Sequence, residues 1–166
     1  MVEVKIQEEW VDKAKEKAEE MGVLKHSFMK GTGNVVGFLG EIVVANYLKA
    51  EIKNTYDYDL IKNQIKIDVK SKRCTSVPKL NYDCSVAAYN TKQKCDYYVF
   101  TRILDSLDTA WICGIIKKDD FFKKSTFYRK GYTDTSNMMT FKEDTYNLRI
   151  CDLIDFKKIN FQREPH

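Results

Sequence analysis

A chain of 166 residues is long enough to bury a hydrophobic core, and we expect a single domain over residues 1–166. Its composition, 43% hydrophobic and 13% aromatic, excludes wholesale disorder, and a net charge of +4 permits a nucleic-acid partner without requiring one. The first residues lack the apolar segment of a signal peptide, and no apolar run approaches the roughly 20 residues that span a bilayer. We therefore expect a cytoplasmic protein that is neither secreted nor held at a membrane.

The five cysteines give no sign of a zinc site or a disulfide framework. Their number is odd, their spacing is wide, and no C-x-x-C pair occurs. Several fall within predicted strands, so we expect reduced core residues. The absence of a G-x-S-x-G motif argues against a serine hydrolase.

The first predicted helix is charged and amphipathic and covers residues 7–21. Trp10, Ala14, Ala18 and Met21 form one stripe along it. We expect this stripe to pack in the core rather than to bind a partner.

A second, largely apolar helix is predicted to run from an N-cap at Asn34 to Leu48. Glu41 is the only charged residue in it. Gly37 and Ala45, one turn away on either side, are small, so another element can approach closely there. Because a buried carboxylate without a partner is costly, Glu41 should meet a cation, a metal ion or a proton. The alternative is that its side chain reaches solvent.

Residues 56–70 form the most informative segment, because they read as two short strands joined at Asn63-Gln64. Successive side chains on a strand point to opposite faces. Asp68 and Lys70 therefore share one face of the second strand, whatever the pairing of the two strands.

The pairing itself predicts a cluster of charges. If the loop has two residues, Asp59 lies directly opposite Asp68 and Asp57 lies opposite Lys70. Opposed like charges destabilise a sheet, so two carboxylates about 5 Å apart beside a lysine indicate a divalent cation between them. A longer turn would shift the partner of Asp68, and a solvated edge hairpin with mixed charges is the alternative interpretation.

The later elements complete an α/β or α+β fold with a central mixed sheet flanked by helices. Strands are predicted at residues 85–89, 96–104 and 109–116, a short helix at 119–124, and a late strand pair at 138–141 and 148–151.

Three short segments carry a family resemblance. They are Gly37-x-x-Gly40-Glu41 on the second helix, Asp59 before the apolar pair Leu60-Ile61, and Asp68-Val69-Lys70. In their order of helix, strand, strand they resemble the PD-(D/E)XK nuclease superfamily, over about a quarter of the chain, residues 34–73. Tyr58 stands where the name-giving motif has proline, which leaves Asp57 as an alternative ligand. The resemblance implies a restriction-endonuclease-like core.

The resemblance also implies a hydrolase that cuts phosphodiester bonds with Mg²⁺ or Mn²⁺. Asp59 and Asp68 would ligate the metal, and Glu41 would ligate it or hold a metal-bound water. Lys70 would orient or help to deprotonate the attacking water. The residue types suit this chemistry, because hard cations prefer carboxylate oxygens and a bound metal lowers the pKa of its water.

Basic residues near these segments are candidate contacts to nucleic acid. Lys72, Arg73 and Lys79 follow the catalytic strand directly, so we expect them to hold phosphates. The family often places a further polar residue on a helix after the catalytic strands, and Gln93 or Lys92 stands at about that point here.

Two weaker candidates remain. The first is a basic and aromatic cluster, namely Lys123, Lys124, Phe127, Tyr128, Arg129, Lys130 and Tyr132. Stacking and charge together would suit single-stranded nucleic acid, although a solvated loop with its aromatic residues turned inward is the favoured interpretation. The second is His26, upstream of Glu41, because some related metal-dependent RNA endonucleases add a histidine there.

The sequence thus favours a metal-dependent deoxyribonuclease, an endonuclease of repair, recombination, restriction or phage DNA metabolism. Cutting both strands would call for a homodimer, since one active site addresses one strand. Two alternatives stay open: a nuclease of the same chemistry that acts on RNA or on branched junctions, and a non-catalytic nucleic-acid-binding module that retains the nuclease core.

Overall fold

The computed structural model describes residues 1–25 and 32–162. Within these residues the chain forms three α-helices and three 3₁₀ turns: α1 (Glu8–Lys25), α2 (Thr32–Leu48), α3 (Lys118–Lys124), η1 (Ala88–Lys92), η2 (Ile150–Asp152) and η3 (Phe156–Lys158). The three predicted helices are confirmed, but α2 begins before the predicted N-cap, so Asn34 lies inside the helix. None of the described helices is long and apolar enough to cross a membrane.

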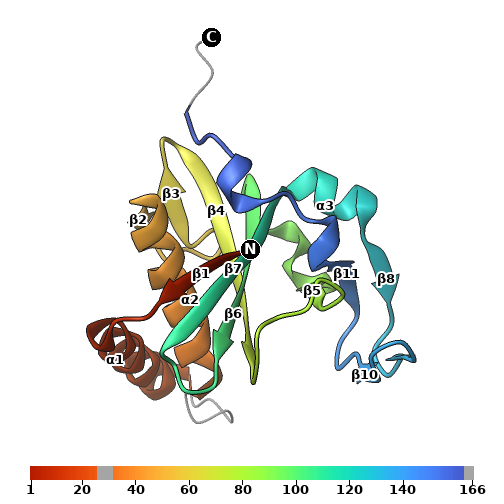
Figure 1. Cartoon of the computed structure of the whole chain (residues 1–166), viewed down its shortest axis with the longest axis horizontal. Helices are drawn as coiled ribbons and strands as arrows, with labels where there is room; N and C mark the ends of the chain where they lie inside the picture. Colours follow the sequence, from red (N-terminus) through yellow and green to blue (C-terminus); the bar gives the residue numbers. More distant parts are fainter. Residues whose placement is uncertain (26–31, 163–166) are drawn as a thin grey trace.

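A curled six-stranded sheet forms the centre of the molecule (Figure 1). Its strands lie in the order β1 (Val2–Lys5), β7 (Thr109–Lys117), β6 (Tyr97–Leu104), β4 (Ile65–Cys74), β3 (Leu60–Lys62) and β2 (Glu51–Ile52). β4 and β6 run parallel, whereas the other neighbours run antiparallel. The sheet is therefore mixed, as the sequence predicts.

The second half of the chain adds smaller sheets. One has the order β5 (Asp83–Ala87), β11 (Thr145–Arg149) and β8 (Thr126–Tyr128), and the other joins β9 (Thr133–Asp134) to β10 (Met139–Thr140). The predicted pairing of segments 138–141 and 148–151 is wrong: β10 pairs with β9, and β11 lies between β5 and β8.

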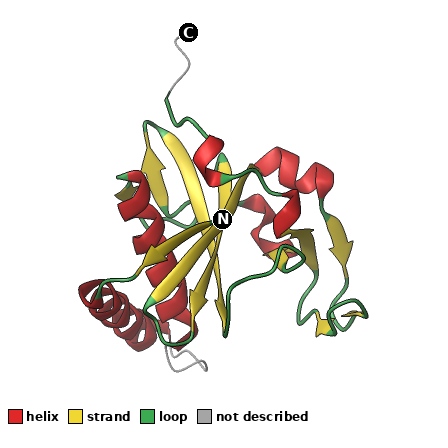
Figure 2. Ribbon diagram, in the orientation of Figure 1, coloured by secondary structure: helices red, strands yellow, loops and turns green. Residues whose placement is uncertain are grey.

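Alternation along the central strands divides the core into two clusters, one on each face of the main sheet. Ile67 and Val69 of β4 belong to the cluster that includes Ala14 of α1 and Leu39 of α2. On the other face, Tyr98 and its neighbours on β6 pack with β5, β11 and α3. Figure 2 shows α1 and α2 gathered on one side of the main sheet and the smaller strands with α3 on the other.

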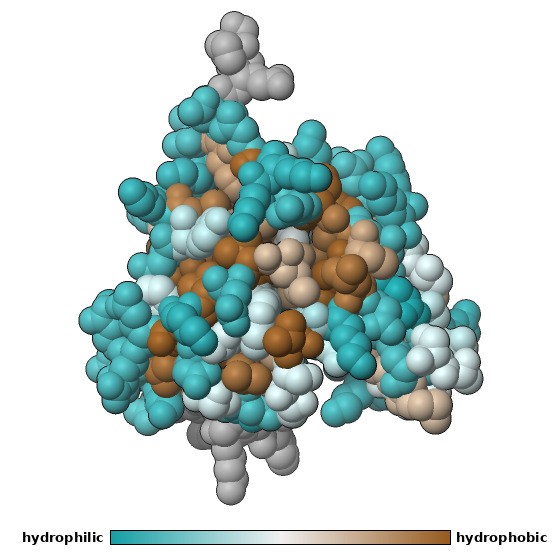
Figure 3. All heavy atoms as spheres, in the orientation of Figure 1, coloured by the Kyte–Doolittle hydropathy of each residue, from teal (hydrophilic) through white to brown (hydrophobic). Residues whose placement is uncertain are grey.

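The predicted core stripe of the first helix is confirmed, since Ala14 and Ala18 are buried and Trp10 packs against the core. In the space-filling view, hydrophilic residues cover α1 and the outer edges, and hydrophobic residues gather near the middle of the face where β1 and β7 lie (Figure 3). All five cysteines are free, and four are buried; Cys151 is exposed.

Glycine fixes the distance between α2 and the sheet at one position. A Cβ added to Gly40 would lie 1.8 Å from Ser71 Oγ and 3.0 Å from Ser71 Cβ, whereas a Cβ added to Gly37 would meet nothing within 4 Å. The close approach that the sequence predicts at Gly37 therefore occurs at Gly40. It seats α2 on β4, the strand that carries Asp68 and Lys70.

This difference gives a matched pair of substitutions in one helix. We expect Gly40→Ala to lower the free energy of unfolding by about 2 kcal/mol, because Ser71 must give up its 2.7 Å hydrogen bond to Thr101 or α2 must move. Gly37→Ala should raise it by about 0.5–1 kcal/mol, since alanine favours the helix. Urea unfolding of both variants measures the difference. Equal values would show that α2 does not depend on the contact at Gly40.

Candidate metal and nucleic-acid site

The β3–β4 hairpin has the register that the sequence predicts. Lys62 pairs with Ile65 and Ile61 with Lys66, across a two-residue loop. Asn63 and Gln64 have φ values of 48° and 67°, as a tight hairpin loop requires at both positions.

The pairing continues to Asp59 but not to Asp57. The Asp59 N–H donates to the Ile67 carbonyl at 3.0 Å, which places Asp59 next to Asp68. The Asp57 carboxylate instead accepts a hydrogen bond from the Lys94 N–H at 3.1 Å. The prediction that Asp57 lies opposite Lys70 is therefore wrong. Asp57 does not pair with β4, because the chain at this point runs beside Lys94, in the turn before β6.

Three carboxyl groups gather beside this hairpin: Glu41 from α2, Asp59 before β3 and Asp68 in β4. Glu41 and Asp68 are buried, with 8% and 2% of their surface exposed. Asp59 Oδ2 accepts a hydrogen bond from the Val69 N–H at 2.7 Å, which fixes its carboxylate against β4. The structure brings these three carboxyl groups close enough together to affect one another's ionisation.

Burial and mutual repulsion hold protons on this cluster. Burial, with the nearby charges of Asp68 and Glu41, raises the pKa of Asp59 to about 8. Burial raises the pKa of Glu41 to about 7, although the positive charge of Lys17 opposes the change. Burial also raises the pKa of Asp68, against the attraction of Lys70. Near neutral pH the cluster therefore exchanges protons, and a cation would favour its ionised form.

Lys70 contacts both an acid and an amide. Its Nζ lies 2.7 Å from Asp68 Oδ2 and donates a hydrogen bond of 3.3 Å to Gln93 Oε1. Gln93 is buried, and its Nε2 donates to the Tyr56 carbonyl at 2.8 Å. The sequence predicts Gln93 as a nucleic-acid contact, but both ends of its amide are occupied within the protein. The structure instead places it behind Lys70, where it orients the ammonium group.

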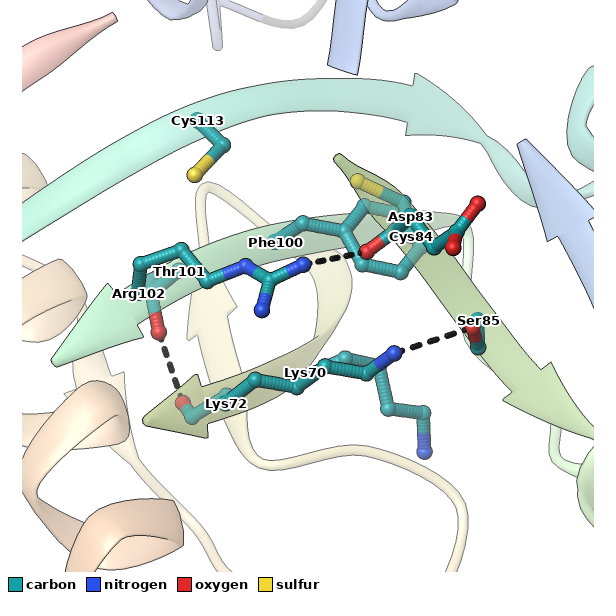
Figure 4. A pocket seen from close by; sticks show the side chains of 10 residues that line it. Lys70, Lys72, Asp83, Cys84, Ser85, Phe100, Thr101, Arg102 and Cys113 are labelled. Carbon is teal, nitrogen blue, oxygen red and sulfur yellow. Dashed lines mark hydrogen bonds between the residues drawn. The ribbon is translucent and has the colours of Figure 1, made fainter. Parts of the chain in front are cut away.

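The three basic residues predicted to hold phosphates lie in different surroundings. Arg73 and Lys79 are exposed. Lys72 points instead between β4 and β5, where its Nζ donates to Ser85 Oγ at 3.0 Å (Figure 4). Burial lowers the pKa of Lys72, and the adjacent Arg102 lowers it further.

Two cations near the site were not identified from the sequence. Lys17 of α1 lies 3.9 Å from Glu41 Oε2 and 4.6 Å from the centre of the Phe38 ring. Lys17 follows Ala14 by three residues, so its position beside the core stripe could have identified it from the sequence. Arg102 pairs with Lys72 in the register of β4 and β6, and only the strand order brings the two together.

The carboxylates suit a hard divalent cation by their chemistry. No group of three His, Cys, Asp or Glu side chains among the described residues is already arranged to hold a metal ion. Two buried oxygens nevertheless lack a hydrogen bond there, Glu41 Oε2 and Asp68 Oδ2, the second in spite of its short ion pair with Lys70. All the donors are carboxylate oxygens, which Mg²⁺ and Mn²⁺ prefer. The residues therefore fit such an ion, once Lys70 yields its contact with Asp68.

The other candidates stand apart from this cluster. Tyr128 stacks on Phe141 with ring centres 4.5 Å apart and on Tyr132 at 5.1 Å, so these aromatic rings pack on one another. Phe127 and Tyr132 are nevertheless exposed. His26 lies outside the described residues.

Comparison with models of protein families found no match to this chain, and a search of curated proteins found none either.

Proposed function

We propose that the protein is a metal-dependent nuclease that hydrolyses phosphodiester bonds in DNA, built on a restriction-endonuclease-like core. The observation that carries the proposal is the meeting of Glu41, Asp59 and Asp68 with Lys70 at one hairpin. The three acids share only two lysine partners, Lys70 beside Asp68 and Lys17 beside Glu41, and crowding them together opposes folding, so stability alone does not account for the arrangement.

Each residue has a role in the proposal. Glu41, Asp59 and Asp68 would hold Mg²⁺ or Mn²⁺, which would supply charge stabilisation to the scissile phosphate when bound. Lys70, oriented by Gln93, would hold its ammonium group where it orients the water that attacks phosphorus. Lys17 would keep a positive charge beside Glu41.

The architecture supports the same proposal. A helix that carries the first acid packs on a mixed sheet, and a hairpin carries the other two acids and the lysine. This is the order of elements that the resemblance to PD-(D/E)XK nucleases implies. Gly40 allows the helix to lie close to β4, which brings Glu41 toward Asp68.

The test is cleavage of labelled substrates with Mg²⁺, with Mn²⁺ and with EDTA. The panel contains single-stranded DNA, duplex DNA, a branched junction and RNA, each labelled at one end and internally. We expect metal-dependent cleavage of DNA, and cutting of both duplex strands would call for a second copy of the chain. Cleavage of RNA or of the junction alone would change the substrate but keep the chemistry. A folded protein that binds these nucleic acids and cuts none of them would instead be a binding module.

A further inference from the structure

A pair of opposed cations lies on the same face of β4 as Asp68 and Lys70. Lys72 of β4 and Arg102 of β6 are directly paired in the parallel register. Like charges at paired positions destabilise a sheet unless an opposite charge lies near. An anion near Lys72 and Arg102 would therefore offset their charge, just as a cation would offset the charge of the three acids.

The protein supplies neutral partners to both cations. Lys72 Nζ donates to the Ser85 hydroxyl at 3.0 Å, and Arg102 Nη2 donates to the main-chain carbonyl of Asp83 at 2.7 Å. The Arg102 guanidinium also lies 5.4 Å from the centre of the Tyr82 ring. Neither cation has a carboxylate within salt-bridge distance among the described residues.

Asp83, an acid that borders the same cavity, is already hydrogen-bonded to other side chains. The Asp83 carboxylate accepts hydrogen bonds from Asn147 Nδ2 and Asn137 Nδ2, each at 2.6 Å. These amides hold the carboxylate in place on β5 and use both of its oxygens. Asp83 therefore makes no ion pair with either cation, and its one negative charge offsets at most one of the two positive charges.

The two cations border open space. A cavity of about 120 Å³ lies between β4, β6 and β5, and Lys70, Lys72, Ser85 and Arg102 are among its lining residues (Figure 4). A second hollow of about 230 Å³ shares Lys72, Asp83 and Arg102 with it. The first is several times the volume that one water molecule needs, so a small anion has room beside the cations.

We infer that Lys72 and Arg102 form a phosphate-binding subsite. The Ser85 hydroxyl lines it but already donates a hydrogen bond to Asn147 Oδ1 at 2.8 Å. Arg102 supplies the planar fork that suits a phosphate, and Lys72 supplies a point charge. On the proposed function, on which this step rests, the phosphate belongs to the nucleic acid. Lys72 follows Lys70 by two residues, a rise of about 7 Å along β4, which is comparable to one nucleotide step from the scissile phosphate.

The first experiment measures inorganic phosphate binding in EDTA, by calorimetry at constant ionic strength with chloride as the balancing anion. We expect Lys72→Gln and Arg102→Gln each to weaken binding about tenfold or more, and Lys157→Gln, an exposed lysine on η3, to leave it unchanged. Arg102→Lys keeps the charge and should restore part of the affinity. Lys72→Gln removes a buried charge, so this variant is expected to fold, and circular dichroism confirms it.

Equal phosphate affinity in the wild type and both glutamine variants would overturn the subsite, as would no phosphate binding by the wild type. Because neither metal nor nucleic acid is present, this result is independent of nuclease activity. A second measurement identifies the source of the phosphate, by comparing the binding of oligonucleotides with and without a terminal phosphate. A loss in the variants confined to phosphorylated ends assigns a terminal phosphate, and a loss with both assigns an internal phosphodiester.

Discussion

Lys70→Met is expected to slow metal-dependent cleavage by about 10²–10⁴-fold without weakening metal binding. Lys70 contacts Asp68 but has no oxygen to offer a metal ion, and its ammonium group lies beside the carboxylates rather than among the ligands. Asp68→Asn should behave differently, because it removes a charged ligand and should weaken both Mn²⁺ binding and cleavage. Single-turnover cleavage at saturating metal, with Mn²⁺ binding measured by electron paramagnetic resonance, separates the two effects.

Asp57→Asn is the matched control for this pair. Asp57 is two residues from Asp59 but accepts its hydrogen bond from the Lys94 N–H, away from the cluster, and asparagine keeps an acceptor there. This variant should cleave at nearly the wild-type rate. Near-normal cleavage by Lys70→Met would remove Lys70 from the reaction, and a large loss in Asp57→Asn would restore Asp57 as a ligand.

The hairpin that carries the acids could be predicted because its information is local. A two-residue loop and strict alternation fix which side chains face one another, so the neighbourhood of Asp59 and Asp68 followed from the sequence. The position of Asp57 could not be predicted, because the chain leaves the sheet at residues that carry no strong turn signal. Glu41 could be identified as a lone charge in an apolar helix, and the resemblance indicated its partners.

The rest of the site depends on pairings between distant segments. The sequence does not show that β6 lies beside β4 in parallel, so it cannot show that Arg102 meets Lys72. The same reason applies to the late strands, since β11 joins β5 and β8 rather than the strand nearest to it in the chain. Gln93 was predicted as a nucleic-acid contact from its residue type and position in the chain, because the sequence does not show its burial.

Asp59→Asn is expected to stabilise the metal-free protein at pH 8. Burial, with the charges of Asp68 and Glu41, raises the pKa of Asp59 to about 8, from 3.8 for a free side chain. Between these values the folded protein keeps a proton that the unfolded chain releases, so the stability from this group is present below about pH 4 and lost as the pH rises to about 8. Asparagine does not ionise, and its amide oxygen can still accept the Val69 N–H.

The variant should therefore gain on the order of 2 kcal/mol over the wild type at pH 8 in EDTA, and much less at pH 5. Urea unfolding at both pH values measures this, with Asp57→Asn as the carboxylate control outside the cluster. Mg²⁺ should reduce the difference at pH 8, because an ion that binds the folded wild type stabilises it and the variant has lost a charged ligand. If the difference between the two proteins does not change with pH, then burial and the neighbouring charges do not raise the pKa of Asp59. The cluster would then need no cation, and no metal site would be expected at this hairpin.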